Sequence, residues 1–170
     1  TQAQRFSDNC LSAIHRRCNA DCTRSGYGPV ENDQDNVRAI CTAATIRETT
    51  FGALGNFNGG CRVGSAFNQG CNDAIDQYCR AEGFGGGYGP VEHVADVAFV
   101  ACVPVAQVER FTVTWAQLAA RHEPCDGQFE RFGPNCAAAV NRECTARSFF
   151  SGWGPLRVQG NQVDVMCIRR

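Results

Sequence analysis

Three cysteine triplets with identical internal spacing constrain this chain more than any other feature of its sequence. In each triplet, seven residues separate the first cysteine from the second, and twenty-two separate the second from the third. A spacing kept this strictly, at a period of roughly sixty residues, indicates an internal tandem repeat. The triplets are Cys10, Cys18 and Cys41; Cys71, Cys79 and Cys102; and Cys136, Cys144 and Cys167.

A glycine-rich turn recurs at the same place inside each triplet. The three copies read GYGPVE, GYGPVE and GWGPLR, and they occupy residues 26–31, 87–92 and 152–157. Together with the cysteines, they divide the chain into unit one (1–60), unit two (61–124) and a truncated unit three (125–170). Glycine permits a positive φ and proline fixes an extended exit, so a strand is expected after each turn.

A short helix is expected between the first two cysteines of each triplet. Counting from the first cysteine, Ala at +3, Ile or Val at +4 and Cys at +8 lie on one stripe at the helical period. Both cysteines then face inward. They cannot bond to each other, because eight helical residues rise about 12 Å, whereas a disulfide needs its Cα atoms within about 7 Å.

A strand ending on the third cysteine is expected next, because Val37, Ala39 and Cys41 show apolar alternation at period two, as do their counterparts. Residues 108–115 predict a second strand, and residues 45–51 are its weaker counterpart. Unit three ends before this strand, which would leave residues 162–168 as an open edge. The predicted fold class is α+β: three disulfide-stapled repeats with little central core, each a short helix plus a small antiparallel sheet.

All twelve cysteines are predicted to form disulfides. Each strand cysteine is expected to join one helix cysteine of its own unit, which leaves one helix cysteine per unit to pair with Cys61, Cys125 or Cys22. The sequence does not tell which helix cysteine does which. Cys22 either closes a local bridge in unit one or reaches unit three across a ring, and local closure is favoured because short loops lose less entropy.

Composition favours an extracellular protein. The chain has 12 cysteines in 170 residues, and small extracellular units use disulfides where they bury too little apolar surface. It starts at Thr1, as expected if a signal peptide has been removed. No apolar run approaches the roughly 20 residues of a membrane span, which argues against membrane insertion. The net charge is −1 and the arginines are spread along the chain, which argues against nucleic acid.

These motifs resemble a cysteine-rich repeat of secreted proteins in myxobacteria and related bacteria. The resemblance rests on the Cys-x7-Cys spacing, the GYGPVE turn and the strand that ends in cysteine, and it covers almost the whole chain. Arg157 departs from the glutamate of the turn. The resemblance implies secretion and repetition, and it implies no particular activity.

The aromatic residue of each turn is the main candidate for binding. Presented between glycines, Tyr27, Tyr88 and Trp153 could stack on a sugar ring, with Glu31 and Glu92 accepting hydrogen bonds from its hydroxyl groups. Three equivalent sites would gain strength by avidity. The same rings could instead fill the small core of each unit, and the scarcity of other large residues favours that alternative.

Catalysis and metal binding find little support. The three histidines occupy unrelated places in the repeat, and no nucleophile motif accompanies them. A zinc site is disfavoured because Cys22 has no cysteine counterpart. Paired acids beside the turns could hold calcium, although solvated acids are the favoured interpretation. These residues are His15, His93 and His122 for catalysis, and Glu31 with Asp35 and Glu92 with Asp96 for calcium.

We therefore expect a non-catalytic extracellular binding protein with no cofactor and no metal. Its expected partner is a cell-surface or matrix glycan, recognised by the repeated turns. The alternative is a structural subunit of an extracellular coat or filament, in which copies of the chain associate through the open edge of unit three.

Overall fold

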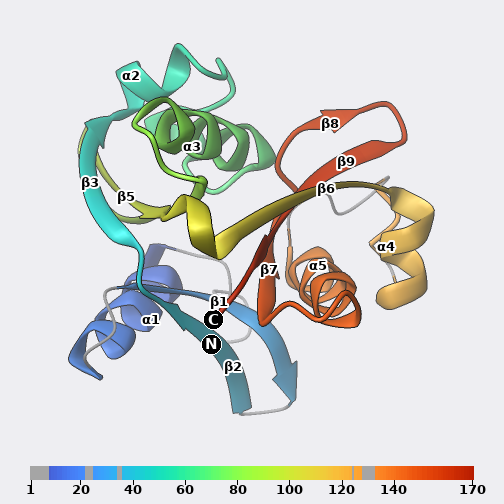
Figure 1. Cartoon of the computed structure of the whole chain (residues 1–170). Coiled ribbons are helices and arrows are strands. Elements are labelled where there is room, and N and C mark those ends of the chain that lie inside the picture. The colour runs from blue at the N-terminus through green and yellow to red at the C-terminus, as the bar shows by residue number, and fades with distance from the viewer. Residues whose placement is uncertain (1–7, 22–24, 34–35, 124, 128–132) are drawn as a thin grey trace.

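The computed structural model describes residues 8–21, 25–33, 36–123, 125–127 and 133–170. Within these ranges the chain is α+β: helices combine with three antiparallel sheets (Figure 1). None of the described helices is both long and apolar enough to cross a bilayer. In chain order the elements are α1 (Asp8–Ala20), β1 (Ser25–Asp33), β2 (Asn36–Thr42), β3 (Thr45–Thr50), α2 (Phe51–Gly55), the 3-10 helix η2 (Val63–Ser65), α3 (Gln69–Ala81), β4 (Gly86–Val94), β5 (Val97–Val103), the 3-10 helix η3 (Val105–Gln107), β6 (Val108–Thr114), α4 (Trp115–Arg121), α5 (Pro134–Ala146), β7 (Ser151–Trp153), β8 (Val158–Gln159) and β9 (Gln162–Ile168).

Helices α1, α3 and α5 confirm the three helices predicted between the first two cysteines of each triplet. Asn68 caps α3, because its side-chain oxygen accepts a hydrogen bond of 2.8 Å from the Cys71 N–H. Helix α5 starts at Pro134, whose fixed φ suits a first helical turn. The predicted apolar stripe is fully buried in α3, where Ala74 and Ile75 have 0% exposure.

The sheets exchange strands along the chain. Strand β3 follows β2 but pairs with β5, in the sheet of order β3-β5-β4. Likewise β6 follows β5 but pairs with β9, which lies between β6 and β7, while β8 pairs with β9 beyond the end of β7. The open edge predicted at residues 162–168 is therefore wrong, because β6 fills it. Strand β2 pairs with β1 alone among the described strands.

Five disulfides join the described residues in two patterns. Three of them connect the end of a long helix to β2, β5 or β9, each with a sequence separation of 23. The other two connect the start of α3 or α5 to the segment before it. The bridges are Cys18–Cys41, Cys79–Cys102 and Cys144–Cys167, then Cys61–Cys71 and Cys125–Cys136.

Cys10 departs from the predicted disulfide set. It is a free, half-buried cysteine, so the prediction of a bridge at this position is wrong. Its counterparts Cys71 and Cys136 bond to a cysteine in the segment before their helix, and residues 1–9 hold no cysteine that could do the same. Cys22, the partner proposed for local closure, lies outside the described residues.

One shared core lies at the centre of the molecule, contrary to the expectation of little central core. The rings of Tyr27, Tyr88 and Trp153 meet there, with centroid distances of 4.9, 5.1 and 5.7 Å. Val30, Val91 and Leu156, one from each turn, pack in the same cluster. Two further clusters lie outside it, where α2 packs near α3 and α4 packs near α5. Figure 1 shows the three long helices arranged around this centre.

The predicted turns are themselves part of strands: residues 26–31 lie in β1, residues 87–92 lie in β4, and the third motif begins in β7. The two glycines of each motif serve different purposes. A Cβ atom added to Gly26, Gly87 or Gly152 would lie 2.2–2.3 Å from a disulfide sulfur, so the first glycine lets the bridge pack directly on the strand. The second glycine, represented by Gly89 with φ +136°, takes a conformation that L side chains rarely adopt. The sequence predicted this second role and not the first.

Candidate functional site

The three turn aromatics are core residues. Tyr27 and Tyr88 have 0% exposure and Trp153 has 2%. The Tyr27 hydroxyl donates a hydrogen bond of 2.7 Å to Ser151 Oγ, and the Tyr88 hydroxyl lies 2.7 Å from Thr42 Oγ1. A ring without accessible surface cannot stack on a sugar, so the prediction that these residues bind glycans is wrong in this structure. Burial between sheets contributed by all three units is the physical reason.

Glu31 and Glu92 are held in ion pairs that span distant parts of the chain. Arg142 Nε of α5 lies 3.1 Å from Glu31 Oε1, and Arg16 Nε of α1 lies 2.7 Å from Glu92 Oε1. Each pair ties a long helix to a strand of another unit: α5 to β1 and α1 to β4. The predicted role of these acids as acceptors for sugar hydroxyl groups therefore competes with an interaction inside the protein.

Calcium binding at the turns gains no support from the described residues. Asp35 lies outside them, and the Asp96 carbonyl oxygen accepts a hydrogen bond of 2.9 Å from the Phe51 N–H. Within the described ranges, no group of three His, Cys, Asp or Glu side chains is placed to hold a metal ion.

Among the described residues, His15 and Ser25 form a serine–histidine pair. His15 Nδ1 lies 3.1 Å from Ser25 Oγ, but Ser25 is fully buried and out of reach of any substrate. Burial lowers the pKa of His15, while the nearby Glu92 carboxylate acts in the opposite direction. The position of His15 in the repeat is taken by Asn141 in α5, whose side-chain oxygen accepts a hydrogen bond of 2.8 Å from Ser151 Oγ. The histidine thus provides a helix-to-strand contact.

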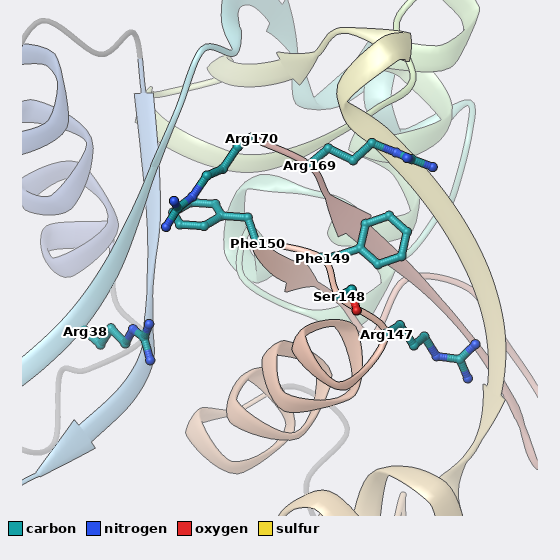
Figure 2. Close-up of a pocket in the computed structure, with 7 residues that line it drawn as sticks. All are labelled: Arg38, Arg147, Ser148, Phe149, Phe150, Arg169 and Arg170. Carbon is teal, nitrogen blue, oxygen red and sulfur yellow. The ribbon is translucent and has the colours of Figure 1, made fainter.

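An arginine pocket lies between β2 and the C-terminal part of the chain. Its cavity volume is about 640 Å³, within the range of small-molecule sites. Figure 2 shows Arg38 entering from β2, a four-residue segment following α5, and two arginines following β9. The lining residues are Arg38, Arg147, Ser148, Phe149, Phe150, Arg169 and Arg170.

Aromatic rings orient three of the four guanidinium groups. Arg169 lies over Phe149 at 5.1 Å from the ring centroid, and Arg170 lies over Phe150 at 4.8 Å. Arg147 lies 4.5 Å over Phe111 of β6. Such cation–π contacts are worth about 0.5–1 kcal/mol at exposed sites, and they restrict long side chains that would otherwise be mobile. The arginine pocket therefore presents its positive charge in a partly fixed arrangement.

Acids outside the arginine pocket balance its charge only in part. Arg147 pairs with Glu143 at 2.6 Å and Arg169 pairs with Glu109, but Arg38 reaches Glu31 only at 4.0 Å. Burial alone would raise the pKa of Glu143, and hydrogen bonds from Arg121 and Arg147 outweigh it and lower the pKa. Because Arg121 and Arg142 share these same carboxylates, the pocket keeps an excess of positive charge.

Sequence reasoning missed the arginine pocket, although one signal was present. The pocket combines residues more than one hundred positions apart, which no local motif connects. However, Arg169 and Arg170 stand where the other units carry Ala43 and Ala44 or Pro104 and Val105, so both depart from the repeat.

In comparisons with known proteins, no family model, no curated protein and no solved structure matches this chain.

Proposed function

We propose that this chain is a non-catalytic binding protein that works outside the reducing cytosol. Five disulfides support this location, because such bonds persist in secreted and extracellular proteins and are rare where thiols are kept reduced. The buried Ser25 beside His15 supports a role without catalysis.

We further propose that three copies of one fold are arranged around the central core. The copies are α1-β1-β2, then β3-α2-α3-β4-β5, then β6-α4-α5-β7-β8-β9. Arg16 and Arg142 occupy the same helical position and pair with Glu92 and Glu31, which occupy the same turn position. At the third junction both partners differ, since Gln77 stands on the helix and Arg157 in the turn. This coupled change supports three equivalent junctions.

The ligand that best fits the arginine pocket is an acidic saccharide. Guanidinium groups bind carboxylate and sulfate oxygens through paired, charge-assisted hydrogen bonds. Phe149 and Phe150 line the same cavity and add apolar surface for the carbon face of a sugar ring. The observation that carries the proposal is that four arginines line one cavity of about 640 Å³.

Calorimetric titration with acidic and neutral saccharides tests this function. We expect oligogalacturonate or dextran sulfate to bind, neutral dextran not to bind, and rising ionic strength to weaken binding. Arg38→Gln combined with Arg170→Gln should reduce affinity at least tenfold, because each arginine loses charge-assisted hydrogen bonds. The control is Arg17→Gln with Arg62→Gln, which removes equal charge from exposed positions outside the pocket. Equal binding by the two double variants would contradict the proposed site.

Assembly with other chains is a second candidate function. The predicted route through residues 162–168 is closed, since β9 already has a neighbour on each side. One observation still favours assembly: β2 carries the same disulfide-bonded position as β5 and β9, but pairs with β1 alone among the described strands.

A further inference from the structure

Within the described residues, the first copy of the proposed repeat has no counterpart of a strand that the other two possess. Strand β3 precedes α3 and lines the outer side of β5, and β6 precedes α5 and lines the outer side of β9. No described strand takes this place beside β2.

Backbone groups of β2 point toward this vacant side. In the third copy, the Arg169 N–H donates a hydrogen bond of 2.8 Å to the Gln107 carbonyl, continuing the β6–β9 register. Since strand residues alternate in direction, Val163 and Val165 also turn their backbone groups toward β6. Val37 and Ala39 hold the aligned positions in β2, so their N–H and C=O groups face the vacant side.

Apolar side chains of the first copy are uncovered where their counterparts are buried. Val37 is 60% exposed, whereas the aligned Ala98 and Val163 have 0% exposure. On α1, Ala13 is exposed and Ile14 is half-buried, although the aligned residues of α3 and α5 are fully buried. Exposed apolar surface of this kind, rimmed by polar groups, marks an interaction site.

The cover in the other copies comes from a short helix that follows the added strand. Thr50 caps α2 and Thr114 caps α4. Each helix then buries an aromatic residue and a leucine three positions later, against the apolar face of the next long helix. These pairs are Phe51 with Leu54 and Trp115 with Leu118. Cys61 and Cys125 follow the two helices and bond to Cys71 and Cys136.

We propose that the vacant side of β2, together with the uncovered face of α1 and Cys10, is an acceptor surface for a segment of a second polypeptide. That segment carries the pattern found twice in this chain: a strand, a threonine cap, an aromatic-x-x-leucine helix and a cysteine. Cys10 is the free counterpart of two bridged cysteines, and it lies on the helix that this segment would cover. The inference rests on the proposed repeat arrangement, and it is tested separately from saccharide binding.

Charge on β2 favours one of the two segments that carry this pattern, residues 45–61 and residues 108–125, as the better mimic of the bound segment. Glu48 of β3 pairs with Phe99, and the position of Phe99 is held in β2 by Arg38. A segment like residues 45–61 would therefore place a carboxylate opposite Arg38. A segment like residues 108–125 would place Thr112 there, because Thr112 pairs with Asp164 at the aligned position of β9. Opposite charges on paired strand residues favour the first.

Binding of synthetic peptides tests the acceptor surface. The protein carries Cys22→Ser, so that Cys10 supplies the free thiol, and the probes are peptides 45–61 and 108–125 with their cysteine replaced by serine. Fluorescence anisotropy should show tighter binding of peptide 45–61, and a Glu48→Lys version should bind roughly tenfold more weakly. Equal or absent binding of peptide 45–61 and its scrambled sequence would overturn the inference.

A pair of variants locates the bound peptide. Ala39→Pro removes an N–H that faces the vacant side and should abolish binding. Ala39→Val is the matched control, because valine stands at the aligned positions 100 and 165, and it should bind as the parent does. Peptide bound equally by both variants would place it elsewhere and overturn the inference. Oligogalacturonate titration of the same samples reports the proposed function separately, so failure of one does not mimic failure of the other.

A thiol-exchange experiment tests the position of Cys10. Peptide 45–61 is prepared with its cysteine sulfur bonded to thionitrobenzoate. The Cys10 thiolate attacks that cysteine sulfur, the new disulfide forms, and the thionitrobenzoate anion leaves with the electron pair of the broken bond. We expect release at least tenfold faster than with the same activated cysteine in a peptide of residues 56–61, and loss of this advantage in Cys10→Ser. Equal rates for the two peptides would overturn the inference.

Discussion

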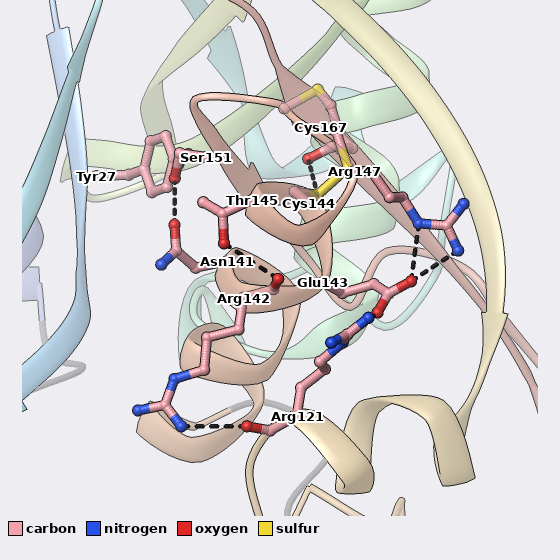
Figure 3. Close-up of a disulfide and its surroundings, with 11 residues drawn as sticks. Tyr27, Arg121, Asn141, Arg142, Glu143, Cys144, Thr145, Arg147, Ser151 and Cys167 are labelled. Atoms are coloured by element: carbon pink, nitrogen blue, oxygen red, sulfur yellow. Dashed lines mark hydrogen bonds and ion pairs between the residues drawn. A yellow bond between two sulfur atoms is a disulfide. The ribbon is translucent and has the colours of Figure 1, made fainter.

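Tyr27, which the sequence predicts as a glycan-binding residue, is a hydrogen-bonded residue of the core. Its hydroxyl donates to Ser151 Oγ, and Ser151 donates in turn to Asn141 Oδ1 at 2.8 Å (Figure 3). This chain of hydrogen bonds satisfies three buried polar groups at once. Burial raises the pKa of Tyr27, and it raises the pKa of Tyr88 to about 12.

These shifts predict that the protein loses stability in alkaline solution. A tyrosine of the unfolded chain ionises near pH 10, while Tyr88 of the folded chain keeps its proton to about pH 12. The stabilisation is therefore complete below pH 10. It is lost as pH rises toward the folded pKa, by about 1.4 kcal/mol per pH unit for each buried tyrosine. Urea denaturation between about pH 9 and pH 11 measures the slope.

The Tyr88→Phe variant separates this effect from other alkaline titrations. Its free energy of unfolding should fall less steeply with pH than that of the parent, because one of the two buried phenols is gone. An unchanged slope in the variant would show that Tyr88 does not hold its proton in the folded state.

At the scale of the elements, the first glycine of each GYGP or GWGP motif leaves the space that a disulfide occupies. Gly87 of β4 has no side chain, so the Cys79–Cys102 bridge packs against its Cα, and the same relation holds for Gly26 and Gly152. The bridge pins the end of a long helix to the strand that follows the turn. Closing a loop of this length contributes about 3 kcal/mol in the chain-entropy model.

Gly87→Ala should therefore disrupt its own disulfide. The added Cβ would meet Cys79 Sγ at 2.3 Å, so either the bridge or the strand must move. We expect a loss of about 3 kcal/mol or more, with free thiols that react under native conditions. Gly59→Ala is the control, because nothing lies within 4 Å of its added Cβ, and its stability should stay close to that of the parent. Thermal denaturation and thiol titration together decide between the expected outcome and an intact, equally stable protein.

Periodicity predicted the elements better than their partners. Helices α1, α3 and α5 and strands β2, β5 and β9 follow from the Cys-x7-Cys stripe and from alternation, both of which are local patterns. Residues 45–51 also predict a strand, yet nothing local states that it pairs with residues 97–102 of the next unit. Pairing between units depends on distant packing, which is why the predicted open edge was assigned to β9 instead of β2.

Across the whole molecule, the central aromatic cluster joins parts that the disulfides leave separate. Each of the five bridges joins cysteines at most 23 positions apart, so none connects one third of the chain to another. The connection comes from Tyr27, Tyr88 and Trp153 and from the Arg16–Glu92 and Arg142–Glu31 pairs. Ion pairs this exposed contribute at most about 1 kcal/mol, so the apolar cluster dominates.

We therefore expect the three parts to unfold together. Trp153 reports on the central cluster and Trp115 on the outer cluster near α5. In Trp115→Phe and in Trp153→Phe, the fluorescence of the remaining tryptophan should change at the same denaturant concentration as the far-UV circular dichroism. Separate midpoints within one variant would show parts that unfold independently.

The candidate site was harder to predict than the helices and strands because its residues come from distant segments of the chain. The turn aromatics stood out in the sequence, but their burial depends on meeting two counterparts from distant segments. The arginine pocket is likewise assembled from β2 and from the two segments that follow α5 and β9. Only the whole molecule brings these residues together, and local patterns do not encode such meetings.

In the proposed three-copy arrangement, the contacting rings also limit how many copies one molecule can hold. With centroid distances of 4.9–5.7 Å, each aromatic side chain contacts both of the others. A fourth copy would have to open this centre and leave a cavity that nothing fills. A repeat added by gene duplication would therefore not join this core. It would have to fold as part of a separate domain.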